Sequence, residues 1–127
     1  MGPAAKKALD RVRAICLALP ETSERPSHGA PTFFAGSKTF VMFMDDHHDD
    51  GRLAIWCSAP LGAQGDLVRA DGERFFVPPY VGHRGWLGIR LDRHVDWDEL
   101  AQLIEDGYRM VATKRAIAKL AGLRASA

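Results

Sequence analysis

Hydrophobic residues recur along the chain with two periods, three to four residues near its ends and two residues in its middle. The longer period predicts a helix over residues 4–19, because the apolar side chains then share one face. Pro20 ends this helix, since proline cannot continue one. The polar, turn-rich stretch 21–29 predicts a surface loop. The apolar helix face consists of Ala5, Ala8, Leu9, Val12, Ile15, Cys16 and Leu19.

Alternation of period two predicts strands in the middle of the chain. Residues 32–34 and 38–44 predict a hairpin that turns at 35–37, and 52–58 predicts the next strand. Strand 38–44 is apolar on both faces, so we expect it to be central or covered by a helix. The alternation assigns Thr39, Val41 and Phe43 to one face and Phe40, Met42 and Met44 to the other, and it turns Leu53, Ile55 and Cys57 inward.

The next part of the chain predicts a short helix and a further strand. The helix spans residues 62–70, and Pro78 and Pro79 then prevent the apolar run 75–77 from continuing as a paired strand. Strand 86–91 alternates again. Leu87, Ile89 and Leu91 are predicted to face the helical layer, and Gly88 is predicted to permit close approach on the opposite face.

Two helices are predicted at the end of the chain. Asp96 is a suitable N-cap, and Glu99 three residues later resembles the second half of a capping box. Thr113 then starts a second, shorter helix with a basic surface. The order of helices and strands predicts the α+β class, because it lacks the regular alternation of a parallel doubly wound sheet.

Length and charge add little constraint on function. A chain of 127 residues has the commonest size of one domain, so a single domain over 1–127 is expected. Seventeen basic and sixteen acidic residues leave a net charge of +1. Dedicated nucleic-acid binders are usually more basic, with a pI above about 9. The charges are nevertheless uneven, because 45–50 holds four aspartates and 114–124 four basic residues without an acid.

The two cysteines, Cys16 and Cys57, lie in apolar segments and are predicted to be small core residues. The sequence leaves a disulfide between them open. No apolar run approaches the ~20 residues that a membrane-spanning helix needs. The basic, amphipathic beginning does not have the apolar core of a signal peptide. We therefore expect a cytoplasmic protein that does not enter a membrane.

The stretch 74–92, RFFVPPYVGHRGWLGIRLD, resembles the signature of the MmcQ/YjbR family of small bacterial proteins. The ALPE sequence at 18–21, the Lys-Thr-Phe start of strand 38–44 and the helix segment 108–114 are also similar to that family. The resemblance implies a frataxin-like α+β fold, an antiparallel sheet covered by N- and C-terminal helices. It also implies the usual label of the family, DNA binding, but no catalytic residues. It does not imply the iron binding of frataxin, because helix 4–19 offers one acid, Asp10, against four basic residues.

The leading functional hypothesis is a binding module that contacts the backbone of nucleic acid without catalysis. Its candidate residues are all basic: Lys38, His83, Arg84, Arg90, Lys114 and Arg115. The alternative is a small-molecule or anion-binding domain, with a cleft around Tyr80, His83, Arg84 and Trp86. An interaction protein with aromatic residues near Pro78 and Pro79 is a third class.

The segment 45–50, Asp-Asp-His-His-Asp-Asp, contains potential metal ligands. Metal ligands usually converge from spaced positions, whereas six consecutive residues in a turn project in different directions. Aspartate and glycine also favour turns for reasons of backbone geometry. We therefore interpret this segment as a solvated turn, with a metal site as the alternative, and expect no cofactor.

Overall fold

Six antiparallel strands form one open sheet in the computed structural model, which describes residues 1–127. The strand order is β1-β2-β3-β4-β6-β5, so the first four strands form a meander and β6 returns between β4 and the edge strand β5. The strands are β1 (Thr22–Ser27), β2 (Ala30–Ala35), β3 (Lys38–Asp45), β4 (Leu53–Cys57), β5 (Phe75–Phe76) and β6 (Leu87–Arg90).

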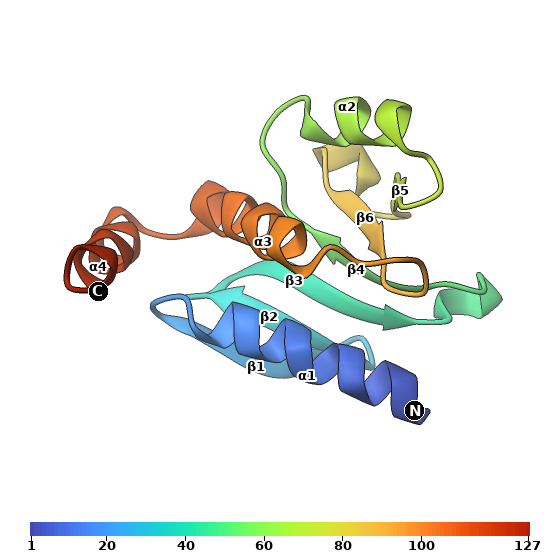
Figure 1. The fold of residues 1–127 in the computed structure, drawn as a ribbon, viewed down its shortest axis with the longest axis horizontal. Helices are drawn as coiled ribbons and strands as arrows, with labels where there is room; N and C mark the ends of the chain where they lie inside the picture. The colour runs from blue at the N-terminus through green and yellow to red at the C-terminus, as the bar shows by residue number, and fades with distance from the viewer.

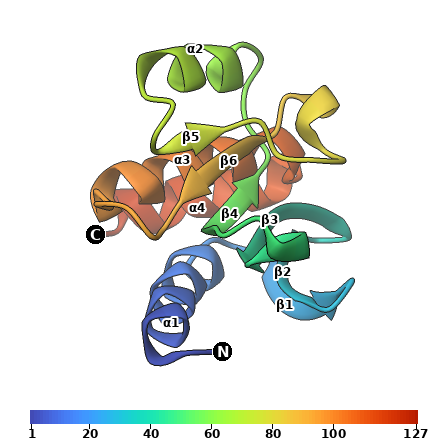
Figure 2. The same ribbon diagram turned by 90° about the vertical axis from the view of Figure 1, so that its right-hand side faces the viewer.

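Four helices accompany the sheet: α1 (Pro3–Leu17), α2 (Ala63–Ala70), α3 (Trp97–Val111) and α4 (Lys114–Ala125). Figure 1 shows α1 and α3 along the sheet and α4 beyond the end of α3. Helix α2 lies beside the β5 edge (Figure 2). The α+β class and the antiparallel sheet are thus confirmed. Crossing a bilayer takes a longer and more apolar helix than any of these four.

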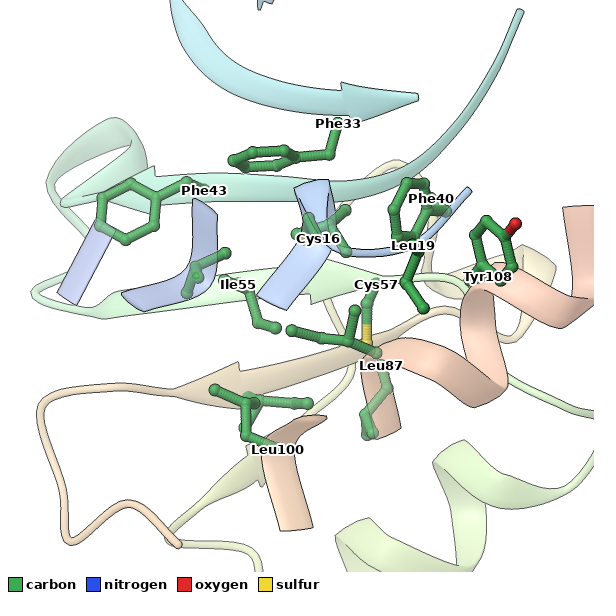
Figure 3. Packing of buried hydrophobic residues seen from close by; sticks show 14 of the residues in the cluster. Cys16, Leu19, Phe33, Phe40, Phe43, Ile55, Cys57, Leu87, Leu100 and Tyr108 are labelled. Atoms are coloured by element: carbon green, nitrogen blue, oxygen red, sulfur yellow. The ribbon is translucent and has the colours of Figure 1, made fainter. Parts of the chain in front are cut away.

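The hydrophobic core lies between one face of the sheet and helices α1 and α3 (Figure 3). It contains 21 buried residues from these elements, their connections and α4. Leu87, Ile89 and Leu91 belong to it, as the alternation predicts. Ile55 and Cys57 of β4 are also fully buried there, which confirms their predicted direction.

Tyr108 of α3 connects three parts of this core. Its hydroxyl group donates a hydrogen bond of 2.7 Å to the carbonyl oxygen of Pro20, directly after α1. Its ring packs edge-to-face on Phe40 of β3, with the centroids 5.7 Å apart. Burial raises the pKa of Tyr108, which keeps the hydroxyl protonated and able to donate. One side chain therefore fixes α3 against both the sheet and the end of α1.

Local capping determines where the last two helices begin. The side chain of Asp96 accepts hydrogen bonds from the backbone N–H groups of Asp98 and Glu99, each 3.1 Å long. The Glu99 carboxylate does not return to close a capping box, because it accepts a 2.8 Å bond from Arg74 instead. Thr113 caps α4 through the N–H of Ala116. Both predicted helix starts are thus confirmed.

The prediction of a surface loop over 21–29 is wrong, because Thr22–Ser27 forms the edge strand β1. An edge strand pairs on one side only and therefore tolerates polar residues and even Pro26. Glu24 faces the helical side, where Arg13 of α1 donates two hydrogen bonds of 2.6 and 2.9 Å to it. An ion pair there replaces the apolar alternation that would have identified the strand.

Strand β3 does not alternate as predicted. Phe33 pairs with Val41 and Phe34 pairs with Thr39, so Phe40 is an extra residue in the register. Such a β-bulge lets two successive side chains point to one face. Phe40 consequently joins Val41 and Phe43 in the core instead of lying on the opposite face.

The opposite face of the sheet, here called the open face, carries a second, smaller apolar cluster. It consists of the buried residues Met44, Ala54, Trp56, Phe76 and Trp86. Gly88 lies under the Phe76 ring, and a Cβ atom on it would come within 2.5 Å of that ring. The predicted close approach at Gly88 is confirmed, since any larger residue would have to displace the Phe76 ring.

Cys16 and Cys57 are free thiols in the core. Burial raises the pKa of both, that of Cys57 to about 12. Neither is therefore a ready thiolate nucleophile, because the thiolate form is disfavoured. The structure confirms them as core residues without a disulfide.

Replacing Leu87 with Ala should destabilise the protein by about 2–5 kcal/mol, the usual cost of truncating a buried aliphatic side chain. Only 1% of Leu87 is exposed. Leu61→Ala is the matched control, because Leu61 is fully exposed and its loss should change stability by less than about 0.5 kcal/mol. Urea unfolding followed by tryptophan fluorescence measures both. Equal destabilisation by the two variants would contradict the assignment of β6 to the core.

Candidate ligand pocket on the open face

A row of paired residues crosses the whole sheet. The register joins, in order, Arg25, Thr32, Met42, Trp56, Gly88 and Phe76, one residue from each strand. Directly paired residues share a face, and Trp56 and Phe76 place this row on the open face. Adjacent strands lie about 4.8 Å apart, so the row spans about 24 Å.

A cavity of about 500 Å³ lies in the middle of this row. We call it the aromatic–histidine pocket. Trp56 forms its base and is 2% exposed, whereas Tyr80 is 68% exposed. Its lining residues are His28, Met42, Met44, His47, His48, Trp56, Tyr80 and Val81.

The β3–β4 turn supplies two of the histidines. His47 and His48 stack on each other with their ring centroids 4.0 Å apart. His47 also meets Trp56 edge-to-face at 4.8 Å and Tyr80 at 5.9 Å. This segment is therefore more than the predicted solvated turn, because one of its side chains packs over the sheet. No three His, Cys, Asp or Glu side chains come together anywhere in the structure as a metal site would require.

Three connections bring residues to the pocket in left-handed backbone conformations. The φ angles of His28, His48 and Tyr80 are +51°, +48° and +66°. Tyr80 is the centre of a tight turn in which the Val81 N–H bonds the Pro79 carbonyl at 2.7 Å. Such conformations are strained in residues other than glycine and concentrate at functional sites.

Helix α2 fixes the Tyr80 loop from behind. The amide nitrogen of Gln64 donates to the carbonyl oxygens of Gly82 and Trp86, at 2.9 and 2.6 Å. Gly82 is the first residue of the short 3-10 turn η2 (Gly82–Arg84), and Trp86 follows the turn. Figure 2 shows η2 and the β3–β4 turn on the side of the sheet away from α1. The walls of the pocket are thus loops held by specific hydrogen bonds.

Two nitrogen atoms of the pocket residues are buried without a hydrogen-bond partner: Trp56 Nε1 and His47 Nε2. An unsatisfied buried polar atom costs about 1–3 kcal/mol. Such atoms are rare in native proteins, and a ligand is one way to satisfy them.

Three arginines lie on aromatic rings of the open face or its margin. The guanidinium carbons of Arg25, Arg52 and Arg84 lie 3.6, 4.0 and 5.4 Å from the nearest ring centroid. The rings are those of Phe34, Phe76 and Trp86, respectively. None of the three arginines forms an ion pair, although eleven ion pairs occur elsewhere in the protein.

The structure brings only some of the predicted cleft residues together, because Arg84 lies over the Trp86 ring but neither residue lines the pocket. Tyr80 lines the pocket, whereas Trp86 is buried beneath the open face. His83 and Arg84 are exposed on η2, outside the pocket lining. The sequence also did not identify Trp56, which forms the base of the pocket. The sequence signal for Trp56 was that the second face of β4 is also apolar. The chain has no further helix to cover this face.

The predicted nucleic-acid contacts lie in three separate places, and His83 and Arg84 on η2 are one of them. Lys38 and Arg115 lie at one end of the molecule, because Glu21 bonds both Arg115 and the backbone of Gly36 in the β2–β3 turn. Lys114 precedes Arg115 at that end. Arg90 lies at the opposite end of the sheet, where its guanidinium makes two 2.9 Å hydrogen bonds to Asp92. These bonds lower the pKa of Asp92, and its carboxylate balances the positive charge of Arg90.

Acidic residues form ion pairs with the basic residues of helix α4. These pairs hold the helix in place and balance its positive charge. Glu21 pairs with Arg115 at 2.9 Å and with Lys119 at 3.0 Å. Hydrogen bonds from these two groups lower the pKa of Glu21 to about 2. Arg124 likewise binds the buried Glu105 and lowers its pKa. Only Lys114 among the basic residues of α4 has no acidic partner.

This fold and pocket define a small α+β domain that leaves one aromatic face of its sheet open. The chain belongs to the YjbR family, whose model matches residues 17–110. It is also similar to the crystal structure of Deinococcus radiodurans protein DR2400, with a DUF419 domain, at a TM-score of 0.71. The two sequences are 18% identical, and the match covers 89% of this chain and 87% of that one, which shows a shared fold. No curated protein matches the chain.

The attachment of α4 should weaken in acid. The lowered pKa of Glu21 contributes stability above the unfolded pKa of about 4.3, and this contribution is lost as the pH falls toward about 2. Glu21→Gln should therefore lower the thermal midpoint at pH 7, with the difference from the unmodified protein vanishing near pH 2. Asp66→Asn is the control, because its ion pair with Arg69 is exposed. A Glu21→Gln effect that does not change with pH would contradict the assigned ion pairs.

Proposed function

We propose that this protein is a binding module for single-stranded nucleic acid, which it receives across the open face of its sheet. The observation that supports this most is the row from Arg25 to Phe76, with the aromatic–histidine pocket in its middle and arginines near both ends. In this proposal one base enters the pocket and the arginines contact the flanking phosphates. No catalysis is part of it.

The pocket suits a flat ring. Tyr80 and the stacked histidines offer π-faces, and Met42 and Met44 add polarisable thioethers. Stacking of a base on an aromatic side chain contributes about 1–3 kcal/mol and is insensitive to sequence. A volume of about 500 Å³ lies within the range of small-molecule sites.

The three arginines suit phosphate. A guanidinium lying on an aromatic ring keeps its charge and leaves its N–H edges available for a forked bond to an oxyanion. Arg25, Arg52 and Arg84 have no acidic partner that a phosphate must displace. This distinguishes them from Arg90 and Arg115, whose charges are neutralised within the chain.

A single strand fits this face better than a duplex does. Bases in a duplex are stacked and cannot enter a pocket unless they are extruded. The exposed side chains of Lys38 and Lys114 remain candidates for additional backbone contacts at the α4 end.

The second candidate function is binding of a free planar molecule in the same pocket. The unpartnered Trp56 Nε1 and His47 Nε2 favour it, because a small heteroaromatic ligand can satisfy both without any phosphate contact. The two functions differ in their dependence on the arginines and on salt.

Replacing Tyr80 with Ala should weaken binding of a fluorescein-labelled oligo-dT by about 1–3 kcal/mol, the contribution of one stacked base. Tyr80 is largely exposed, so the variant should fold normally. Val77→Ala is the control, because Val77 is exposed next to the same loop but does not line the pocket. Fluorescence anisotropy measures both. Equal affinities of the two variants would show that the pocket is not part of the binding site.

The dependence of the affinity on salt concentration should measure the number of phosphate contacts. Three arginine contacts to a single strand predict a slope of about −2 for log affinity against log salt concentration, at about −0.7 per contact. Arg25→Ala, Arg52→Ala and Arg84→Ala should each make the slope less steep by about 0.7. Arg69→Ala should leave it unchanged, because Arg69 is exposed on α2 and paired with Asp66.

Two outcomes would overturn nucleic-acid binding. One is no binding of the oligonucleotide at low salt, and the other is binding that the three arginine variants leave unchanged. Saturable binding of free adenine or indole that shifts the Trp56 indole N–H signal, without affinity for the oligonucleotide, would establish the second candidate instead.

A further inference from the structure

A second hollow lies on the helical side of the molecule, away from the open face. It has a volume of about 460 Å³ and is bordered by α1 and by the connection from β6 to α3. We call it the α1 groove. Positions 4, 7, 8 and 11 of the chain line it, which is one face of a helix at steps of three and four residues. Its other lining residues are Leu91, Arg93, His94, Val95 and Trp97.

The α1 groove is basic and contains no acid. Lys7, Arg11, Arg93 and His94 border it, together with five residues that carry no charge. Lys7, Arg11 and His94 form no ion pair, and Arg93 Nη1 lies 3.7 Å from an Asp92 oxygen. That carboxylate is already bound by Arg90 through two shorter hydrogen bonds.

Nearby acids are directed elsewhere. Asp10 on α1 accepts a 2.9 Å bond from Arg13. Asp96 caps α3, and Glu99 binds Arg74. Apart from Arg93, which also faces Asp92, the positive charge of the groove is therefore not balanced by the residues beside it, in contrast to the charges of α4.

Arg11 is held in a defined position in the groove. Its guanidinium carbon lies 4.3 Å from the centroid of the Trp97 ring. This cation–π contact orients the planar group and reduces the conformational entropy that ligand binding costs. The N–H edges of the guanidinium have no acceptor within the protein, so they are available to a ligand.

The beginning of α1 adds positive potential. Gly2 precedes the helix without a side-chain cap, and its first turn has no acidic residue. The partial positive charge at a helix N-terminus is therefore uncompensated there. Ala4, in this first turn, and Ala8 line the groove with small side chains, which let a ligand approach the helix closely.

We propose that the α1 groove binds a phosphate dianion, the terminal phosphate of a small phosphorylated compound. Two guanidinium forks and an ammonium group match the charge and the several acceptor oxygens of such a group better than those of a single carboxylate. Leu91 and Val95 offer apolar contact to the rest of the compound. The site is independent of the open face, so it stands whether or not nucleic acid binds there.

Isothermal titration of the protein with inorganic pyrophosphate tests this proposal. Saturable 1:1 binding is expected, and Lys7→Ala and Arg11→Met should each weaken it about tenfold, the usual effect of losing a charge-assisted hydrogen bond. Lys6→Ala is the matched control, because Lys6 is exposed next to Lys7 but does not line the groove. It should change the affinity less than twofold, and all three variants should keep their thermal midpoints.

Competition by further ligands tests which chemical group the groove recognises. Glucose 6-phosphate should compete with pyrophosphate, whereas malonate should compete at least about tenfold more weakly. Absence of pyrophosphate binding, or equal losses with Lys6→Ala and Lys7→Ala, would overturn the site. Equal affinity for malonate would also overturn it and leave an unselective basic surface. If an oligonucleotide binds through Lys7 and Arg11 and pyrophosphate does not compete, the groove recognises a phosphodiester chain and the proposal is wrong.

Discussion

The sheet has two apolar faces, but the chain provides helices for only one of them. Helices α1 and α3 cover the face that carries Phe33, Val41 and Ile55. The other face carries Trp56 and Trp86, which are too large and apolar to be left in water. Turns must therefore close it. The position and shape of the aromatic–histidine pocket depend on this constraint, because short turns cannot cover the middle of a six-stranded sheet as evenly as a helix does.

The closing turns are strained at the positions that meet the pocket. His28, His48 and Tyr80 have positive φ angles, which glycine would adopt without cost. Glycine occupies several other positions with positive φ, for example Gly36 and Gly85, although Glu21, Asp46 and Asp49 also adopt such angles outside the pocket lining. A strained histidine or tyrosine persists only where the surrounding structure holds it. The buried indole nitrogen of Trp56 has no hydrogen-bond partner, which is a cost that a purely apolar ring at this position would not have.

The sequence predicts those elements whose signal is local. Alternation along 86–91 and the caps at Asp96 and Thr113 each depend on a few neighbouring residues, and all three are confirmed. Strand β1 was missed because its stability comes from pairing with β2 and from the ion pair between Arg13 and Glu24, eleven residues apart. A bulge at Phe40 likewise depends on the register of the partner strand and leaves no trace in the alternation itself.

The candidate sites show the same division. The run around Tyr80 drew attention to one wall of the pocket, but its base, Trp56, and the histidines of the β3–β4 turn come from other strands and meet only in the folded sheet. The availability of a charge is also a tertiary property. Arg90 and Arg115 resemble free phosphate contacts in the sequence, yet Asp92 and Glu21 bind them, and Glu21 lies 94 positions from Arg115.

Net charge is a poor guide to binding in this protein, because pairing decides which charges face a ligand. Most acidic partners in the ion pairs lie around α1, α3 and α4, where they fasten helices to the sheet and to each other. Arg25, Arg52 and Arg84 remain unpaired around the open face, and Lys7 and Arg11 remain unpaired along the α1 groove. A chain with a net charge of +1 can thus keep unpaired basic side chains in two separate places, one around aromatic rings and one along the first helix.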